Sequence, residues 1–141
     1  MTQAGIEQIS PWLHIYDPGV GEKEPWYIND HCFYFGPDNK WHLTGITHAE
    51  PRNPHDEILL AHATADSLTQ VPWEKQAPLL RAEAQADEVL LWAPHVVRHQ
   101  ELYYMYYCAG GGAGQCDPSN FRLHLATSAD GWQWQRSPAN P

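Results

Sequence analysis

Residues 102–107 read Leu-Tyr-Tyr-Met-Tyr-Tyr, and they carry the clearest structural signal in the chain. Side chains of a β-strand point alternately to the two faces of its sheet, so this segment presents apolar or aromatic groups on both faces. A strand of a two-layer sandwich would keep one face polar, whereas a strand covered from both sides can be apolar throughout. The segment therefore predicts a sheet with a neighbour on each side, and an ordinary β-sandwich is the competing interpretation.

The rest of the chain has the composition of an all-β protein. Twelve prolines and ten glycines divide it into short apolar pieces of strand length. Gly36-Pro37-Asp38-Asn39 has the composition of a tight hairpin turn. One helix is a candidate, at 78–89, where the apolar spacing is irregular. The predicted strands are 26–35, 40–47, 58–64, 90–97, 101–108, 121–128 and 132–136, with a further candidate at 12–16.

These strands recur with a period slightly shorter than half of the chain. Ala63-Thr64 recurs as Ala126-Thr127, and Trp41-His42-Leu43 is matched at nearly the same offset by Tyr103-Tyr104-Met105. Four antiparallel strands per repeat are typical of a β-propeller blade. The sequence thus predicts one all-β domain over residues 1–141, an incomplete propeller with two blades per chain. Residues 1–78 hold an N-terminal segment and blade one, and residues 79–141 hold blade two.

The overall charge and hydropathy exclude several classes of partner. The 141 residues include 17 Asp and Glu against 8 Lys and Arg, for a formal net charge of −9. An acidic balance disfavours nucleic acid and anionic membrane surfaces, since both are bound through basic patches. The sequence has neither an apolar run of the roughly 18 residues of a membrane span nor the pattern of a signal peptide. We expect a soluble, cytoplasmic protein.

The cysteines, histidines and glycine-rich stretch do not indicate a cofactor. Cys108 and Cys116 flank residues 109–114 and could meet across a loop, but three cysteines without metal-ligand spacing favour free thiols. The glycine-rich stretch lacks the strand–loop–helix context and the lysine of a phosphate-binding loop. Among the nine histidines, the pairs His42 with His48 and His31 with His95 lack a third ligand at a recognisable spacing. We expect no metal and no cofactor.

Several segments, taken in order, resemble a known family. Residues 26–31 (Trp-Tyr-Ile-Asn-Asp-His) and 38–43 (Asp-Asn-Lys-Trp-His-Leu) resemble the first blade of the five-bladed propeller glycoside hydrolases of families 43 and 32. This superfamily includes arabinanases, xylosidases and β-fructosidases. Residues 91–96 (Leu-Trp-Ala-Pro-His-Val) and the strand at 102–107 look like the second blade. Residues 125–134 resemble the Ala-Thr-Ser-x-Asp-Gly-x-x-Trp pattern that closes that blade.

The resemblance implies a catalytic role for Asp30. Glycosidic cleavage needs one carboxylate as base or nucleophile and a second group as acid on the other side of the bond. In the family the first of these is an Asp on the innermost strand of the first blade, and Asp30 is the matching residue. An Asp within an aromatic strand segment is costly to bury unless it is paired or functional. An Asp in a turn or at a strand end, bonded to backbone amides, is the alternative.

Two features of the chain depart from the family pattern. His95 stands where the second blade usually carries an Asp that orients the acid; an imidazole can still donate a hydrogen bond or a proton near neutral pH. The acid itself is a Glu in the third blade, and residues 137–141 stand where that blade would begin. The resemblance therefore implies an incomplete catalytic pair in one chain. The candidate catalytic residues are Asp30 and His95, and the candidate sugar-binding residues are Trp26, Asn29, His31 and Trp92.

Three hypotheses for function follow from these observations. The first is a carbohydrate-active protein that hydrolyses glycosidic bonds with Asp30 as base or nucleophile. The second is a sugar-binding module without catalysis, and the third is a structural fragment that binds nothing small. Because two isolated blades would expose apolar sheet faces, we also expect the chain to associate with itself, first of all as a homodimer. The polar loop at 50–57 is expected to be a solvated connection or a substrate contact.

Overall fold

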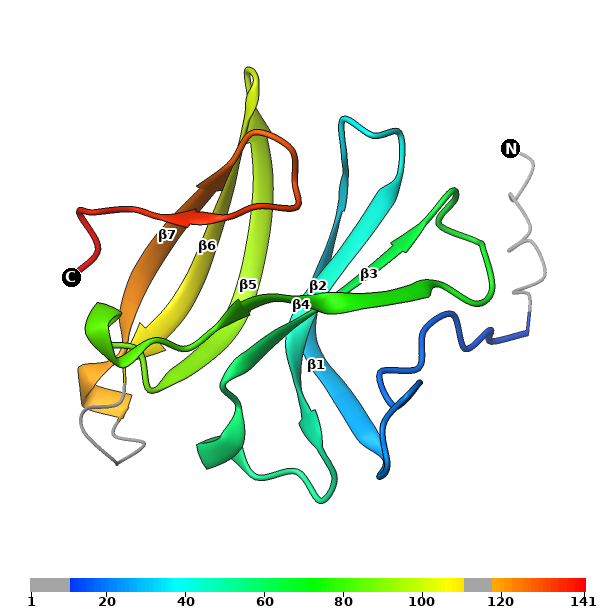
Figure 1. The fold of residues 1–141 in the computed structure, drawn as a ribbon, viewed down its shortest axis with the longest axis horizontal. Coiled ribbons are helices and arrows are strands. Elements are labelled where there is room, and N and C mark those ends of the chain that lie inside the picture. The colour runs from blue at the N-terminus through cyan, green and yellow to red at the C-terminus, as the bar shows by residue number, and fades with distance from the viewer. Residues whose placement is uncertain (1–10, 111–117) are drawn as a thin grey trace, which may run out of the picture.

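The computed structural model describes residues 11–110 and 118–141, and it contains two four-stranded antiparallel sheets (Figure 1). In both sheets each strand is hydrogen-bonded to the next along the chain. Three short 3₁₀ turns lie in the connections, η1 (Pro54–Asp56), η2 (Ala84–Ala86) and η3 (Pro118–Asn120). The all-β class and the two four-stranded blades are therefore confirmed. The first sheet comprises β1 (Trp26–Phe35), β2 (Trp41–Ala49), β3 (Leu59–Ala65) and β4 (Glu74–Arg81), and the second comprises β5 (Leu90–His99), β6 (Leu102–Gly110), β7 (Arg122–Ser128) and β8 (Gln135–Arg136).

The strand register carries the sequence repeat into the structure. Trp41 of β2 pairs with Ala65 of β3, and Tyr103 of β6 pairs with Ser128 of β7. Trp41 and Tyr103 are separated by the offset at which Trp41-His42-Leu43 matches Tyr103-Tyr104-Met105. Ala65 and Ser128 are separated by the offset between the two Ala-Thr dipeptides. The blades thus correspond residue by residue in their two middle strands, and a residue of one blade has a defined counterpart in the other.

Two local expectations are wrong. Residues 78–89 do not form a helix: β4 continues to Arg81, and the single turn η2 follows. Leu80 pairs with Leu60 of β3, because burial against the sheet outweighs the helix propensity of a segment without a regular helical apolar period. The sheet of blade one thus continues past residue 78, where the sequence analysis divides the two blades of the single domain. Residues 12–16 are not a strand either; they lie beside blade one, where Ile15 O accepts a 2.7 Å hydrogen bond from Trp73 N.

The main core lies between the two blades. Its buried side chains include Leu60 and Leu80 from blade one and Val96, Met105 and Tyr107 from blade two. These strand positions are apolar because β5 of blade two packs against β1, β2 and β3.

Two tyrosine hydroxyls also join the blades, and each blade donates one of the two hydrogen bonds. Tyr34 of β1 donates a 2.7 Å hydrogen bond to Gly131 O of blade two. Tyr103 of β6 donates a 2.8 Å hydrogen bond to Phe35 O of blade one. The contact between blades is therefore specific as well as apolar.

The outer faces of the two blades differ. On blade one, residues before β1 cover the sheet, and Tyr16 packs with Leu43 and Trp73 in a second buried cluster. On blade two, the residues that alternate with the core positions face outward: Tyr106 is 39% exposed and Leu123 is 67% exposed. Among the described residues, the strand at 102–107 is therefore covered from one side, and the side chains on its second, open face are partly exposed.

Two further expectations concern the cysteines and the membrane. Cys32 and Cys108 are free thiols, and burial raises the pKa of both. Cys116 and most of the glycine-rich stretch at 109–114 lie outside the described residues. Within the part of the chain that the structure describes, no helix has the length and apolar character needed to cross a membrane.

Candidate functional site

Asp30 lies in a β-bulge on the first strand of blade one. The pairing of β1 with β2 shifts by one residue between Asn29 and His31, so Asp30 has no partner across the sheet. Its φ of 35° falls in the left-handed region, which non-glycine residues adopt at a cost of about 1–3 kcal/mol. Asn29 Oδ1 accepts a 2.9 Å hydrogen bond from Asp30 N and stabilises this turn. The exposed Asp30 carboxylate makes no hydrogen bond or ion pair with another described residue.

Gly45 of β2 gives the bulge the space it needs. It pairs with His31, directly beside Asp30. A Cβ at Gly45 would lie 2.7 Å from His31 Cβ and 2.9 Å from Asn29 O, closer than such atoms approach one another. A glycine is therefore required opposite the bulge, and the position of Asp30 depends on it.

Blade two has a bulge at the corresponding place on its first strand. The pairing of β5 with β6 shifts between Trp92 and His95, and Ala93 adopts a φ of 48°. Asp30 and Ala93 are as far apart in the sequence as Ala63 and Ala126, so they occupy equivalent positions in the repeat. His95 lies just after this second bulge, is exposed, and makes no polar or ring contact with another described residue.

The two bulges lie on neighbouring strands. Cys32, two residues after Asp30, packs beside the backbone of Val96, the residue after His95. Asn29, Asp30 and His31 thus share one bulge, and His95 follows the matching bulge on the adjacent strand β5.

The two predicted tryptophans pack against other aromatic or charged side chains instead. The ring of Trp26 lies 5.6 Å from that of His48, and Lys75 Nζ lies 5.4 Å from its centroid. Trp92 stacks on Phe121 with the ring centroids 4.5 Å apart. Both indoles are half-buried and contribute to packing at the start of their strands.

Near the start of β1 the structure adds a carboxylate that the sequence analysis did not single out. Glu57, in the polar loop at 50–57, is fully buried, and its Oε1 accepts hydrogen bonds from Tyr27 (3.1 Å) and Arg52 Nε (3.0 Å). Burial and the Glu57 charge raise the pKa of Tyr27 to about 12. Glu57 O also accepts a hydrogen bond from Leu91 N, so this loop is a structural connection between the blades. The sequence feature that could have indicated a buried Glu57 is its position directly before the apolar Ile58.

A second polar cluster joins the hairpin turn of blade one to blade two. Asp38 Oδ1 accepts a 3.2 Å hydrogen bond from His42 Nε2, and its Oδ2 accepts a 3.0 Å hydrogen bond from Trp132 Nε1. His42 Nδ1 lies 2.9 Å from His62 Nε2. A Cβ at Gly36 would lie 2.5 Å from His42 Nε2, so the glycine of the predicted turn makes room for this chain of hydrogen bonds.

The electrostatics of this cluster follow from its burial. Burial, and then the neighbouring His42, lower the pKa of His62 to about 3, so the ring is neutral near pH 7. Partial burial opposes ionisation of Asp38, but hydrogen bonds from His42 and Trp132 outweigh it and lower the pKa of the carboxyl. An ionised Asp38 therefore accepts hydrogen bonds from His42 and Trp132, and His42 in turn contacts the neutral ring of His62.

None of these groups forms a metal centre. Within residues 11–110 and 118–141, no set of three or more His, Cys, Asp or Glu side chains is arranged to hold an ion. Of the histidine pairs weighed from the sequence, His42 contacts His62 rather than His48.

A third polar cluster is structural. Glu88 is buried, and its carboxylate accepts from Arg136 Nε (3.0 Å), Arg136 Nη2 (2.7 Å) and the Tyr107 hydroxyl (2.6 Å). Arg136 also donates to Arg81 O at 2.6 Å. This cluster ties the last strand of blade two to the connection between the blades, a contact for which the sequence pattern gave no signal.

Comparison with curated proteins finds relatives that share part of this sequence. No family model matches the chain. The uncharacterized proteins Rv1502 and MT1551, from two strains of Mycobacterium tuberculosis, are each 30% identical to it over 112 residues. The match covers 79% of this chain and 33% of each relative. The chain therefore spans about a third of the length of these curated relatives.

Comparison with solved structures identifies the fold. RS223-β-xylosidase matches 81% of this chain with a TM-score of 0.58 at 20% identity. The Bombyx mori GH32 β-fructofuranosidase BmSUC1 also covers 81%, with a TM-score of 0.57 at 21% identity. CoXyl43, a GH43 β-xylosidase/α-arabinofuranosidase from a compost metagenome, gives 0.54 at 19% identity. The matched regions are 36%, 23% and 35% of those chains, respectively.

The architecture is thus that of a partial propeller. The chain has the fold of two blades of the β-propeller found in family 43 and family 32 glycoside hydrolases, as the sequence resemblance implied.

Proposed function

We propose that this chain is the carbohydrate-active part of a propeller-type glycoside hydrolase, in which Asp30 acts as base or nucleophile. The observation that carries the proposal is the Asp30 carboxylate, exposed and without a partner among the described residues, on a strained bulge of the first strand. A strained backbone is retained when the surrounding structure enforces it, and such residues cluster at functional sites. A carboxylate used only to stabilise the turn would be expected to accept hydrogen bonds from nearby backbone amides.

His95 is proposed to assist from the neighbouring strand. It is exposed on β5, one residue before Val96, whose backbone lies beside Cys32 of β1. An imidazole there can donate a hydrogen bond to a sugar hydroxyl or to a leaving-group oxygen. The second carboxyl group that glycoside hydrolysis needs is assigned to a further blade or a partner chain.

Replacement of Asp30 by Asn tests the catalytic role. Asn keeps the size of the side chain and removes its charge, so we expect turnover of aryl β-xylosides, α-arabinofuranosides and β-galactosides to fall by at least about 100-fold. Asp66→Asn, at an exposed Asp, is the matched control and should leave the rate unchanged. Equal turnover by the wild type and Asp30→Asn would exclude a catalytic Asp30.

The second candidate is a sugar-binding module without catalysis. The same geometry favours this function if no further blade or chain supplies the catalytic acid. The strands β1 and β5, which pack against each other, then offer hydrogen-bonding groups from Asn29, Asp30, His31 and His95. Titration of xylo- and galacto-oligosaccharides against tryptophan fluorescence separates it from a purely structural role. Saturable binding without turnover would support the module, and neither binding nor turnover would leave the structural role.

A further inference from the structure

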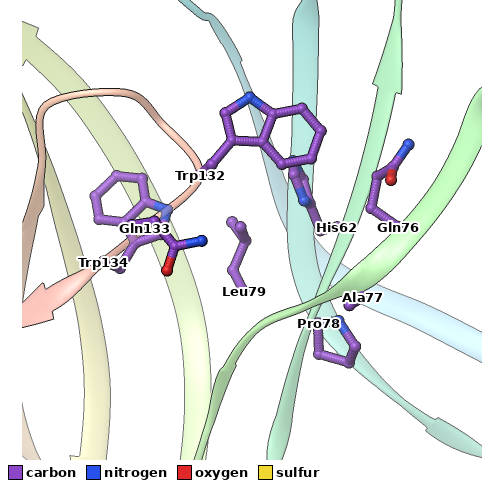
Figure 2. A pocket seen from close by; sticks show the side chains of 8 residues that line it. All are labelled: His62, Gln76, Ala77, Pro78, Leu79, Trp132, Gln133 and Trp134. Carbon is purple, nitrogen blue, oxygen red and sulfur yellow. The ribbon is translucent and has the colours of Figure 1, made fainter.

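A pocket of about 270 Å³ opens between the two blades. It is formed by β3, β4 and the loop before β8, and it contains none of the residues of the Asp30 bulge. Figure 2 shows Gln133 and Trp134 on one side of it, Gln76, Ala77 and Pro78 on the other, and Trp132 and Leu79 between them. The volume is slightly below the roughly 300–1,000 Å³ of sites for drug-sized ligands, so it suits one small molecule rather than a polymer.

The chemistry of the lining is polar but uncharged. The described residues around the pocket include two indoles, one imidazole and two carboxamides, with no Lys, Arg, Asp or Glu among them. Aromatic faces bind the C–H surface of a pyranose ring, while amides and imidazole nitrogens bind its hydroxyl groups. The lining residues are His62, Gln76, Ala77, Pro78, Leu79, Trp132, Gln133 and Trp134.

The buried hydrogen-bond chain leaves one ring nitrogen available at the pocket. The Asp38 carboxylate only accepts, so His42 donates to it from Nε2, and His42 Nδ1 faces His62. The 2.9 Å contact with His42 Nδ1 engages His62 Nε2 and leaves His62 Nδ1 as the second hydrogen-bonding nitrogen of that ring. That nitrogen has no partner among the described residues, although His62 is only 2% exposed and lines the pocket.

The histidine pair is not repeated in blade two. By strand register, Tyr104 of blade two is the counterpart of His42, since each pairs with the Thr of an Ala-Thr dipeptide. Leu125 is likewise the counterpart of His62. Tyr104 and Leu125 are half-buried on the outward face of blade two, so among the described residues two buried imidazoles occupy these positions in blade one alone.

We propose that this pocket between the blades is a second carbohydrate site, which binds one neutral sugar unit. The indoles of Trp132 and Trp134 contact the sugar ring, and His62 Nδ1 forms a hydrogen bond with a sugar hydroxyl. Gln133, whose side chain makes no hydrogen bond to another described residue, and the Oε1 of Gln76 supply further polar contacts. The site is separate from Asp30 and independent of catalysis there.

Ligand-observed saturation-transfer NMR and calorimetry with D-xylose, D-galactose and D-galacturonate test the proposal. We expect at least one neutral sugar to bind with a millimolar or lower Kd. Galacturonate should have a Kd at least fivefold higher, because no cation is among the described lining residues. Ala77 is exposed and lines the pocket, so Ala77→Phe fills it without disturbing the buried histidines, and it should weaken binding at least tenfold. Ala139→Phe, at an exposed Ala outside the pocket, is the matched control and should bind as the wild type does.

Two further variants distinguish this site from the one at Asp30. Gln133→Ala removes an exposed amide and should weaken binding about two- to tenfold, as expected for one hydrogen bond. Asp30→Asn should leave binding in this pocket unchanged even if it abolishes turnover. The proposal is overturned if no neutral sugar binds, if Ala77→Phe binds as well as Ala139→Phe, or if galacturonate binds as tightly as the neutral sugars.

Discussion

Removal of the Glu88 carboxylate should lower the free energy of unfolding more than removal of an exposed charge does. Glu88 is buried and accepts hydrogen bonds from Arg136 and from the Tyr107 hydroxyl. In Glu88→Leu, the side chain keeps a similar volume, but the guanidinium and the hydroxyl lose their shared acceptor. Arg136 is only 18% exposed, so water replaces that acceptor poorly.

The magnitude follows from the partners that remain. Removing one member of a buried ion pair costs about 3–5 kcal/mol. Arg136 keeps its 2.9 Å contact with Glu83 and its hydrogen bond to Arg81 O, which places the expected loss near the lower limit, at about 3 kcal/mol. For a chain of this size that corresponds to a fall in Tm of about 10 °C.

Urea unfolding followed by tryptophan fluorescence measures the loss. The double variant Glu88→Leu/Arg136→Met should be at least about 1 kcal/mol more stable than the sum of the two single variants implies, because the uncompensated cation is gone. Lys40–Asp66, an exposed pair at 3.2 Å, provides the control, and Asp66→Asn should change stability by less than about 0.5 kcal/mol. A loss below about 1 kcal/mol for Glu88→Leu, or strict additivity in the double variant, would refute the reasoning.

Three further outcomes are expected. Gly45→Ala should displace the Asp30 bulge, with a stability loss of about 1–3 kcal/mol in urea and a parallel loss of any turnover that depends on Asp30; unchanged stability and rate would contradict the proposed role of Gly45. The folded-state pKa of about 3 for His62 lies below its unfolded value, so its contribution to stability is complete above pH 6.5 and is lost as the pH falls toward 3, by at most about 1.4 kcal/mol per pH unit. The urea midpoint of His62→Gln should accordingly depend less steeply on pH between 6.5 and 5 than that of the wild type. Self-association is expected through the open face of blade two: light scattering should give twice the chain mass of 16.1 kDa, and Tyr106→Lys/Leu123→Lys should give the monomer, whereas a monomeric wild type would exclude it.

The strand pattern could be predicted from sequence because it rests on local signals. β1 coincides with the predicted strand at 26–35, and β3 and β7 differ from prediction by one residue at one end or both. β4 was missed because it is an edge strand: most of its side chains are exposed or half-buried, and Leu79 and Leu80 gave no clear alternation. Its formation depends on pairing with β3, which is not local information.

The candidate site was predictable as a motif but not as geometry. The resemblance pointed to Asp30, yet the left-handed φ and the need for Gly45 arise from register shifts between strands. The contact of His42 with His62 joins residues on neighbouring strands, and Trp132 reaches them from the other blade. Pairings of this kind depend on how the blades pack, which composition and spacing do not encode.

The reciprocal hydrogen bonds of Tyr34 and Tyr103 bear on how the molecule comes apart. Repeat proteins whose units touch only through an apolar contact can lose one unit while its neighbour stays folded. Here a tyrosine of each blade donates a hydrogen bond to a backbone carbonyl of the other, so separating the blades breaks two directional hydrogen bonds as well as the apolar contact. Amide protons in β2 and β6 should consequently exchange with solvent at one common free energy, and the two blades should behave as a single cooperative unit.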